Sequence, residues 1–125
     1  MKRYVLKLDN KELEFEINKV ARQAASSVVV KSGTCWVLCA VTFNEKPRND
    51  IDFTPLTVDY IERMYAIGKI PGGFIKKEGK PTDNEIIKAR LIDRTIRPLI
   101  DPNFFNDINI YINVFSADVK ERPEI

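Results

Sequence analysis

The residue types best suited to binding chemistry gather between positions 68 and 99, where a glycine-containing loop leads into an arginine-rich segment. The loop "PGGFIKKEGKP" places an aromatic ring next to three cations. A nucleobase stacks on such a ring for about 1–3 kcal/mol per base, and lysines neutralise the phosphates of a single strand. The alternative is that the apolar residues turn into the core and the lysines only solubilise the loop. The residues concerned are Phe74, Ile75, Lys76, Lys77 and Lys80.

Three arginines recur at intervals of four and three after this loop. On a helix, Arg90, Arg94 and Arg97 fall within about 60° of one another, between two apolar sectors. We therefore expect partly desolvated guanidinium groups that need a carboxylate or a phosphate as acceptor. Asp93 is three residues from Arg90 and four from Arg97, which leaves a structural Arg–Asp network open for both. Arg94 lacks an obvious acidic partner nearby and is the better candidate for a ligand phosphate.

Other common chemistries are excluded or disfavoured. The chain has no histidine, which removes histidine metal sites and Ser–His or Cys–His nucleophile pairs. Cys35 and Cys39 lie on one predicted strand about 13 Å apart, beyond the roughly 7 Å that a disulfide tolerates, so we expect small core residues. Asp50 and Asp52 sit in a polar loop without a third ligand and do not predict a metal site.

Charge is unevenly distributed along the 125 residues. The chain has a net charge of +2, but the window 63–98 holds nine Lys/Arg against four acids, a net charge of +5. This asymmetry points to a local anionic partner, although a solvated charged face is the common alternative. No apolar run approaches the roughly 18 residues of a membrane helix, and the N-terminus lacks the apolar centre of a secretory signal, so we expect a cytoplasmic protein.

The elements that must position these residues are mostly strands. "RYVLKLD" and "KELEFEI" flank a turn at Asp9-Asn10, and Leu13, Phe15 and Ile17 alternate with glutamates, which predicts one buried and one wet face. "SSVVVKSGTCWVLCAVTF" predicts two strands around Ser32-Gly33, the second central and covered on both faces. "LTVDYIERMYA" and "DINIYINVFSAD" predict two more strands, so the fold class is α+β.

One strong helix is predicted from about Asp83 to Arg97. Thr82 followed three residues later by Glu85 forms a capping box, and Pro98 discourages continuation. The helix has two apolar sectors. The first holds Ala89, Ile92, Ile96 and Leu99, and the second holds Ile87 and Leu91.

The segment "PLTVDYIERMYAIGKIPGGFIKKEGKPTDNEIIKARLIDRTIRPLI" resembles the N-terminal catalytic-core domain of the bacterial polynucleotide phosphorylase family. The family has a similar order of a "TVDY" strand, a PGG loop, an aromatic-aromatic-basic-basic tetrad and an arginine-rich helix. The upstream "ARQAASSVVVKSGTCWVLCAVTF" is also similar, so the resemblance covers roughly Val5 to Ala117.

The resemblance implies an RNase PH-like fold, with a mixed or antiparallel sheet and one main helix packed on it. It also implies a homotrimeric ring with a central pore and 3′-to-5′ phosphorolysis of single-stranded RNA in mRNA degradation. Inorganic phosphate is the co-substrate, nucleoside diphosphates are released, and Mg²⁺ is the cofactor. Proteins of RNA-degradation complexes are implied partners, and a membrane is not.

The resemblance assigns residues by position. The tetrad that grips RNA at the pore entrance maps onto Phe74, Ile75, Lys76 and Lys77, and Arg90, Arg94 and Arg97 fall in the segment near RNA and phosphate. Ile75 stands where the family's tetrad has its second aromatic residue. Lysines stand in place of arginines, which keeps the charge but loses two-point phosphate contacts.

The family's phosphate-binding serines and metal-binding aspartates lie in a second, homologous domain. We therefore expect residues 1–125 to be a partial first core domain without catalytic or metal-binding residues, inactive alone. Two alternatives remain open: a non-catalytic RNase PH-like scaffold subunit, and a small RNA-binding module with no attached enzyme.

Overall fold

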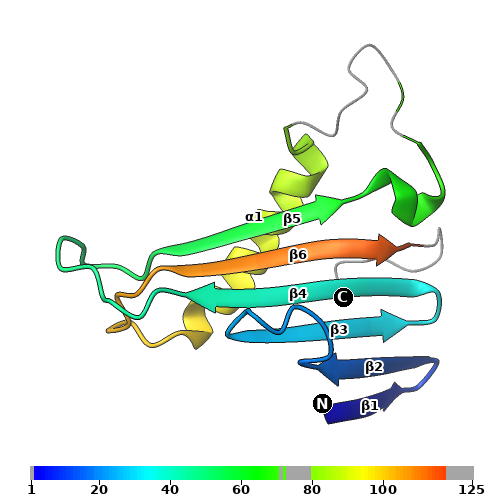
Figure 1. Cartoon of the computed structure of the whole chain (residues 1–125), viewed down its shortest axis with the longest axis horizontal. Helices are drawn as coiled ribbons and strands as arrows, with labels where there is room; N and C mark the ends of the chain where they lie inside the picture. Colours follow the sequence, from blue (N-terminus) through cyan, green and yellow to red (C-terminus); the bar gives the residue numbers. More distant parts are fainter. Residues whose placement is uncertain (1, 71, 73–79, 118–125) are drawn as a thin grey trace.

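A mixed sheet of six strands and a helix on one of its faces make up the computed structural model, which describes residues 2–70, 72 and 80–117 (Figure 1). Two short 3-10 helices, Met64–Ile67 and Arg97–Leu99, accompany the longer helix α1, Asp83–Ile96. The strands in chain order are β1 Lys2–Leu8, β2 Lys11–Ile17, β3 Ser26–Ser32, β4 Cys35–Phe43, β5 Leu56–Glu62 and β6 Ile108–Ser116.

The strand order across the sheet is β1-β2-β3-β4-β6-β5. The first four strands form an antiparallel meander, joined at the predicted Asp9-Asn10 turn and at Gly33, whose φ of +54° suits a residue without a Cβ. β6 then inserts between β4 and β5, antiparallel to β4 and parallel to β5. The α+β class and the positions of these strands are confirmed, and β5 lies at an edge of the sheet.

β5, α1 and β6 form a parallel β–α–β unit. Figure 1 shows β5 and β6 pointing the same way, with α1 on the far face of the sheet. With both strands pointing up and α1 towards the viewer, β6 lies to the left of β5. The crossover is therefore left-handed, against the strong right-handed preference of such units.

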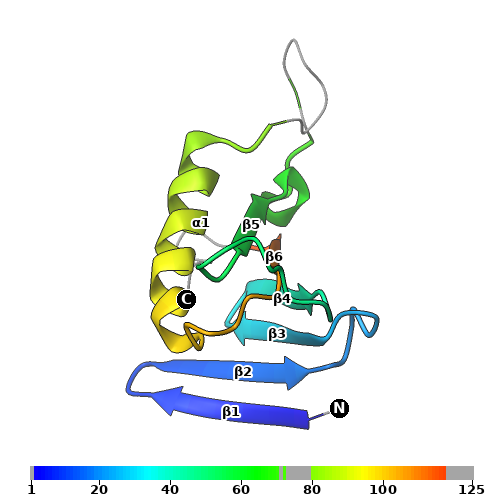
Figure 2. The same ribbon diagram turned by 90° about the vertical axis from the view of Figure 1, so that its left-hand side faces the viewer.

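The core lies between α1 and the β5–β6 part of the sheet. Tyr60, Ile110, Ile112 and Val114 are buried there, and one apolar sector of α1 packs on them. That sector comprises Ala89, Ile92 and Ile96. Figure 2 shows that α1 covers one face of the sheet only.

Three sequence-based expectations about burial are wrong. β4 is central but not covered on both faces, because α1 covers only one, and Trp36 keeps 43% of its surface exposed. Leu99 was expected in the buried sector, but it lies beyond the end of α1 in a 3-10 turn and is 83% exposed. Glu16, assigned to a wet face, is 5% exposed.

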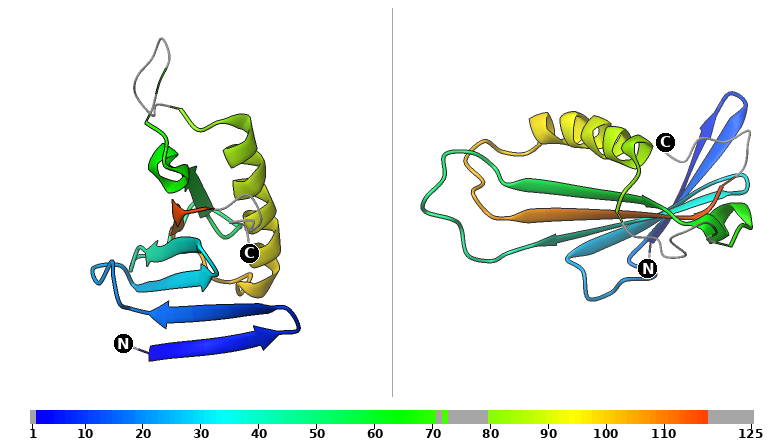
Figure 3. Two further views of the ribbon diagram at one scale, coloured as in Figure 1. Left: turned by 90° about the vertical axis from the view of Figure 1, so that its right-hand side faces the viewer. Right: turned by 90° about the horizontal axis from the view of Figure 1, so that it is seen from above.

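One element boundary also differs from expectation. The strand predicted through "LTVDYIERMYA" ends at Glu62, and the chain then turns into the 3-10 helix Met64–Ile67, which Gly68 terminates with a φ of +69°. The view from above in Figure 3 shows this turn at the end of β5. Among the described residues, no helix is long and apolar enough to span a membrane.

Candidate functional site

The predicted capping box holds the start of α1 against the end of β5. The Glu85 N–H donates to Thr82 Oγ1 at 3.3 Å, and the Thr82 N–H donates to Glu85 Oε2 at 2.6 Å. The other carboxylate oxygen of Glu85 accepts the N–H of Glu62 at 2.8 Å. Glu85 is buried, so one carboxylate both caps the helix and ties it to the sheet.

Lys88 belongs to the basic window 63–98, and its charge is neutralised within the protein. It forms an ion pair with Glu62, and its Nζ lies 5.5 Å from the centre of the Tyr60 ring. The Tyr60 hydroxyl donates to the same Glu62 carboxylate at 2.9 Å. No local sequence pattern predicts this cluster, because Lys88 and Glu62 are far apart in the chain and meet only when α1 packs on β5.

Arg97 forms the structural Arg–Asp contact that the sequence left open, rather than an unpaired binding group. Its Nη2 donates to Asp93 Oδ1 at 2.8 Å and its Nε donates to Oδ2 at 3.3 Å, a two-point contact. Its Nη1 donates to the C=O of Thr54 at 3.0 Å, just before β5. Arg97 therefore ties the end of α1 to the sheet, as Glu85 ties its start.

Arg90 and Arg94 are different. Both are exposed, and neither has a hydrogen-bond or ion-pair partner within the described part of the chain. The predicted second apolar sector is itself open to solvent, with Ile87 65% and Leu91 58% exposed. The expectation of partly desolvated arginines between two buried walls is therefore wrong for this pair. Their charge is available to an external anion.

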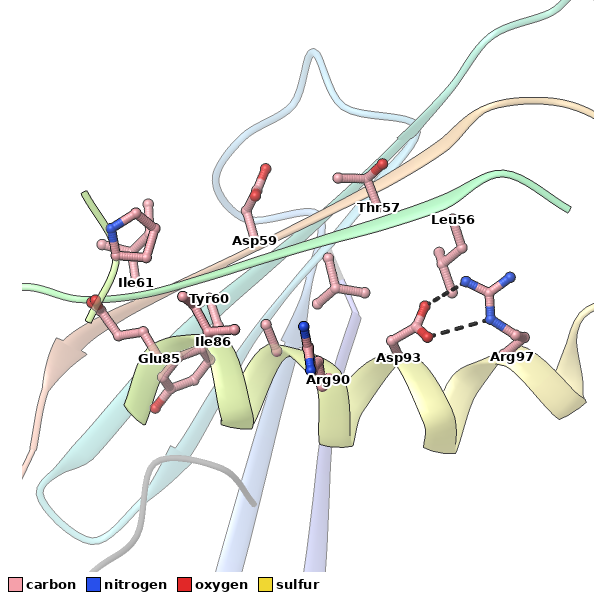
Figure 4. Close-up of a pocket in the computed structure, with 13 residues that line it drawn as sticks. Leu56, Thr57, Asp59, Tyr60, Ile61, Glu85, Ile86, Arg90, Asp93 and Arg97 are labelled. Atoms are coloured by element: carbon pink, nitrogen blue, oxygen red, sulfur yellow. Dashed lines mark hydrogen bonds and ion pairs between the residues drawn. The ribbon is translucent and has the colours of Figure 1, made fainter. Parts of the chain in front are cut away.

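A cavity of about 400 Å³ lies between β5 and this side of α1 (Figure 4). Arg90 and Asp93 line it from α1, Arg97 lines it from just beyond the end of α1, and residues 56–61 line it from β5. In the close-up the Arg90 side chain stands between the helix and the strand. The structure thus places Arg90 and Arg97 along one cavity.

The loop residues predicted to grip RNA are only partly covered. Phe74, Ile75, Lys76 and Lys77 lie outside the described residues, so the two alternatives for the aromatic residue stay open. Lys80 is described and exposed, two residues before the N-cap Thr82 of α1.

A second charged cluster, which the sequence analysis missed, lies on β2 and β3. Glu16 accepts hydrogen bonds from Lys19 at 2.8 Å and pairs with Lys31 at 3.1 Å, while Lys31 also reaches Glu14 at 3.4 Å. The Lys31 ammonium lies 4.3 Å from the centre of the Trp36 ring. The hydrogen bond from Lys19, with help from Lys31, lowers the pKa of Glu16 despite its burial. The alternation of glutamates on β2 opposite Lys31 on β3 was the available signal.

Metal and thiol chemistry find no support in the described residues. No group of three or more His, Cys, Asp or Glu side chains gathers there, and Asp50 and Asp52 are both exposed. A Mg²⁺ ion therefore does not fit this part of the chain. Cys35 and Cys39 do not form a disulfide, as expected, and burial raises the pKa of the Cys39 thiol. What the described site offers is fixed positive charge beside an apolar cavity.

Comparisons with known proteins agree with this picture. Residues 9–123 match the RNase PH description "3' exoribonuclease family, domain 1". The crystal structure of rice Rrp46 matches with a TM-score of 0.62 at 16% identity, covering 86% of this chain and 47% of that one. At this identity the match supports the fold alone, and it confirms the expected RNase PH-like architecture.

Curated relatives named polyribonucleotide nucleotidyltransferase are much more similar. The one from Caldicellulosiruptor saccharolyticus is 48% identical over 122 residues, 98% of this chain and 17% of the relative. That from Heliobacterium modesticaldum is 48% identical over 125 residues, the whole chain and 18% of the relative. That from Sulfurihydrogenibium azorense is 54% identical over 110 residues, 88% of the chain and 16% of the relative. The chain thus spans less than a fifth of the length of these proteins.

Proposed function

The chain belongs to the RNase PH family of 3′ exoribonucleases, and from that premise we propose that it forms the RNA-binding pore entrance of a phosphorolytic 3′-to-5′ exoribonuclease. The complete enzyme would use inorganic phosphate to release nucleoside diphosphates from RNA during mRNA degradation. The name of the similar curated relatives, polyribonucleotide nucleotidyltransferase, supports this reaction. On this proposal the chain supplies grip on the substrate and no catalytic group.

The observation that carries the proposal is the pair of exposed arginines without partners on α1. Lys88 on α1 and Arg97 just beyond its end form ion pairs within the molecule, whereas Arg90 and Arg94 have no partner among the described residues. Because a phosphodiester backbone is a continuous line of anions, adjacent free guanidinium groups suit it. We assign phosphate contacts to Arg94, Arg90 and Lys80, and place Phe74, Ile75, Lys76 and Lys77 along the same strand of RNA.

The rest of the assembly follows the same proposal. We place the Mg²⁺ ligands outside this chain, because its described residues hold no suitable cluster. A homotrimeric ring in the cytoplasm, associated with other RNA-degradation proteins, is part of the proposal. The non-catalytic scaffold alternative is not favoured, since the similar curated relatives are named as transferases.

The test is the salt dependence of binding to a short single-stranded RNA, measured by fluorescence anisotropy. Each phosphate contact contributes about −0.7 to the slope of log K against log salt concentration. We expect Arg94→Gln to flatten the slope by about 0.7. The paired replacement Lys76→Ala/Lys77→Ala should flatten it by about 1.4, twice that contribution.

The matched control is Arg22→Gln, which removes the same charge from an exposed arginine between β2 and β3. It should leave the slope unchanged. Equal flattening by Arg22→Gln and Arg94→Gln would mean that only net charge matters. An unchanged slope for Arg94→Gln would remove Arg94 from the path of the RNA.

A further inference from the structure

A second cavity lies between the 3-10 helix Met64–Ile67 and the start of α1. Its volume is about 340 Å³, within the roughly 300–1,000 Å³ of small-molecule sites. Glu62 at the end of β5 and Val114 near the end of β6 both line it. These strands are parallel neighbours, and open sheets hold ligands beyond the carboxyl ends of parallel strands. The place of this cavity in the fold therefore suits a ligand.

Part of the cavity wall is apolar and only partly covered. Ala66 and Val114 are buried in that wall, whereas Met64 is 42% exposed and Ile67 is 53% exposed. A flat aromatic ring placed in the cavity would remove the apolar surface of these two side chains from water, which favours binding. This wall fits a ring better than it fits a phosphate.

Glu62 supplies a hydrogen-bond acceptor that the described part of the chain leaves unused. The Tyr60 hydroxyl donates to Glu62 Oε1 at 2.9 Å, and the Lys88 ammonium donates to the same oxygen. No described residue donates to Oε2, and the Glu62 side chain stays 34% exposed. Because two bonds hold one oxygen of the carboxylate, the other oxygen is a positioned acceptor for the N–H of a ligand.

The cavity adjoins the segment to which RNA contacts are assigned. The chain leaves the cavity wall at Ile67 and returns to it at Thr82, the N-cap of α1. Lys80, one of the proposed phosphate contacts, is exposed two residues before Thr82. Two residues span at most about 7 Å, so an RNA strand whose phosphate meets Lys80 passes close to the cavity.

We propose that this cavity binds one base of the RNA and favours cytosine, whose N4 amino group donates to Glu62 Oε2. The inference rests on the proposed function, because the base belongs to the strand whose phosphate Lys80 contacts. The ring packs against Met64 and Ile67, and the sugar and phosphate stay outside. Carboxylates of Glu and Asp accept from cytosine N4 when proteins read bases. Uracil has a carbonyl oxygen at the same ring position, which a carboxylate repels.

The experiment compares the binding of short oligocytidine and oligouridine strands by fluorescence anisotropy at one salt concentration. Cytosine and uracil are similar in size, so their comparison isolates the group at this ring position. We expect oligocytidine to bind at least about fivefold more tightly, the lower end of what one base contact supplies.

Glu62→Gln tests the acceptor. Tyr60 and Lys88 still donate to the oxygen at the Oε1 position, so the amide places its NH₂ group at the Oε2 position. That group donates to uracil O4 and opposes the amino group of cytosine, so the preference should reverse in favour of oligouridine. Glu12→Gln removes the same charge from an exposed position on β2 and should keep the wild-type ratio. A loss of net charge alone would change the binding of both strands equally.

Ile67→Trp tests the cavity without altering Glu62. The larger side chain fills the space for the base and should bring the ratio of the two affinities close to one. The slope of affinity against salt should stay unchanged, since the cavity holds a base and no phosphate. Ile87→Trp is the matched control, an exposed isoleucine of α1 outside the cavity, and should keep the wild-type ratio. If Glu62→Gln fails to fold, Ile67→Trp against Ile87→Trp decides alone.

Two results overturn this inference and leave the proposed function standing. One is equal affinity of the wild-type chain for the two strands. The other is a wild-type preference that Glu62→Gln or Ile67→Trp leaves unchanged. Absence of binding to either strand would contradict the proposed function, and this inference with it.

Discussion

Two charged regions of the molecule have similar composition but different surroundings. On β2 and β3, Glu16 is buried, Lys31 is half-buried, and each charge has a partner of opposite sign. On α1, Arg90 and Arg94 are exposed and have no partner in the described part of the chain. The difference teaches that the density of charge in a sequence does not identify a binding surface. What matters is which charges the fold has already neutralised.

The largest expected effect comes from Glu85 on α1, whose buried carboxylate is satisfied by backbone N–H groups. Glu85→Ala removes the acceptor for two backbone N–H groups, and hydrogen bonds to a charged group contribute about 1.5–3 kcal/mol each. We expect a loss of about 3 kcal/mol or more in the free energy of unfolding, measured by urea denaturation.

Asn84→Ala is the matched control for that measurement. Asn84 is exposed in the same first turn of α1, so its replacement should change stability by no more than about 0.5 kcal/mol. Comparable losses for the two variants would show that the hydrogen bonds of Glu85 to Thr82 and Glu62 are not the source of the effect.

The next effect is a dependence of stability on pH. Folding lowers the pKa of Glu16, foremost through the hydrogen bond from Lys19, so the ionised carboxylate stabilises the fold at pH values above its ordinary pKa. That contribution is lost as the pH falls through the lowered folded-state pKa. We expect Glu16→Gln to be less stable than wild type at neutral pH but to lose less on acidification, read as melting temperature against pH.

Glu12→Gln is the control, since Glu12 is exposed on the same strand. On acidification its melting temperature should fall as much as that of the wild type. If acidification lowers the melting temperature of Glu16→Gln as much as that of wild type, the β2–β3 cluster does not contribute to acid sensitivity. The charged residues of β2–β3 would then differ from those of α1 only in how deeply they are buried.

The smallest of these effects distinguishes arginines within α1. Arg97→Lys keeps the charge but loses the two-point contact with Asp93 or the bond to the Thr54 C=O, and because Arg97 is partly exposed we expect a loss of about 1 kcal/mol. Arg94→Lys should cost at most about 0.5 kcal/mol. Thermal unfolding of both variants checks this, and a cost for Arg94→Lys as large as that for Arg97→Lys would contradict the assignment of Arg94 as unpartnered.

Local signals in the sequence predicted much of the fold. The capping box at Thr82 and Glu85 formed as expected, and the turns at Asp9-Asn10 and Gly33 joined the predicted strands. These features depend on residues within about four positions of one another, so a single sequence carries them. For the candidate site, the spacing of the arginines along one helix and the possible pairing of Asp93 with Arg97 were also local signals, since they involve residues three or four positions apart.

What the tertiary structure decided involves residues far apart in the chain. Insertion of β6 between β4 and β5 made β5 an edge strand, and the packing of α1 on β5 brought Thr54 within reach of Arg97 and set Lys88 against Glu62. Composition and periodicity say which residues prefer burial but not which distant strand will sit beside them. The sequence by itself determined the helix and strands and the number of cations that the chain carries. The pairing of distant elements decided which of these cations remained unpaired, because a charge is neutralised only by the groups that folding brings within a few ångströms.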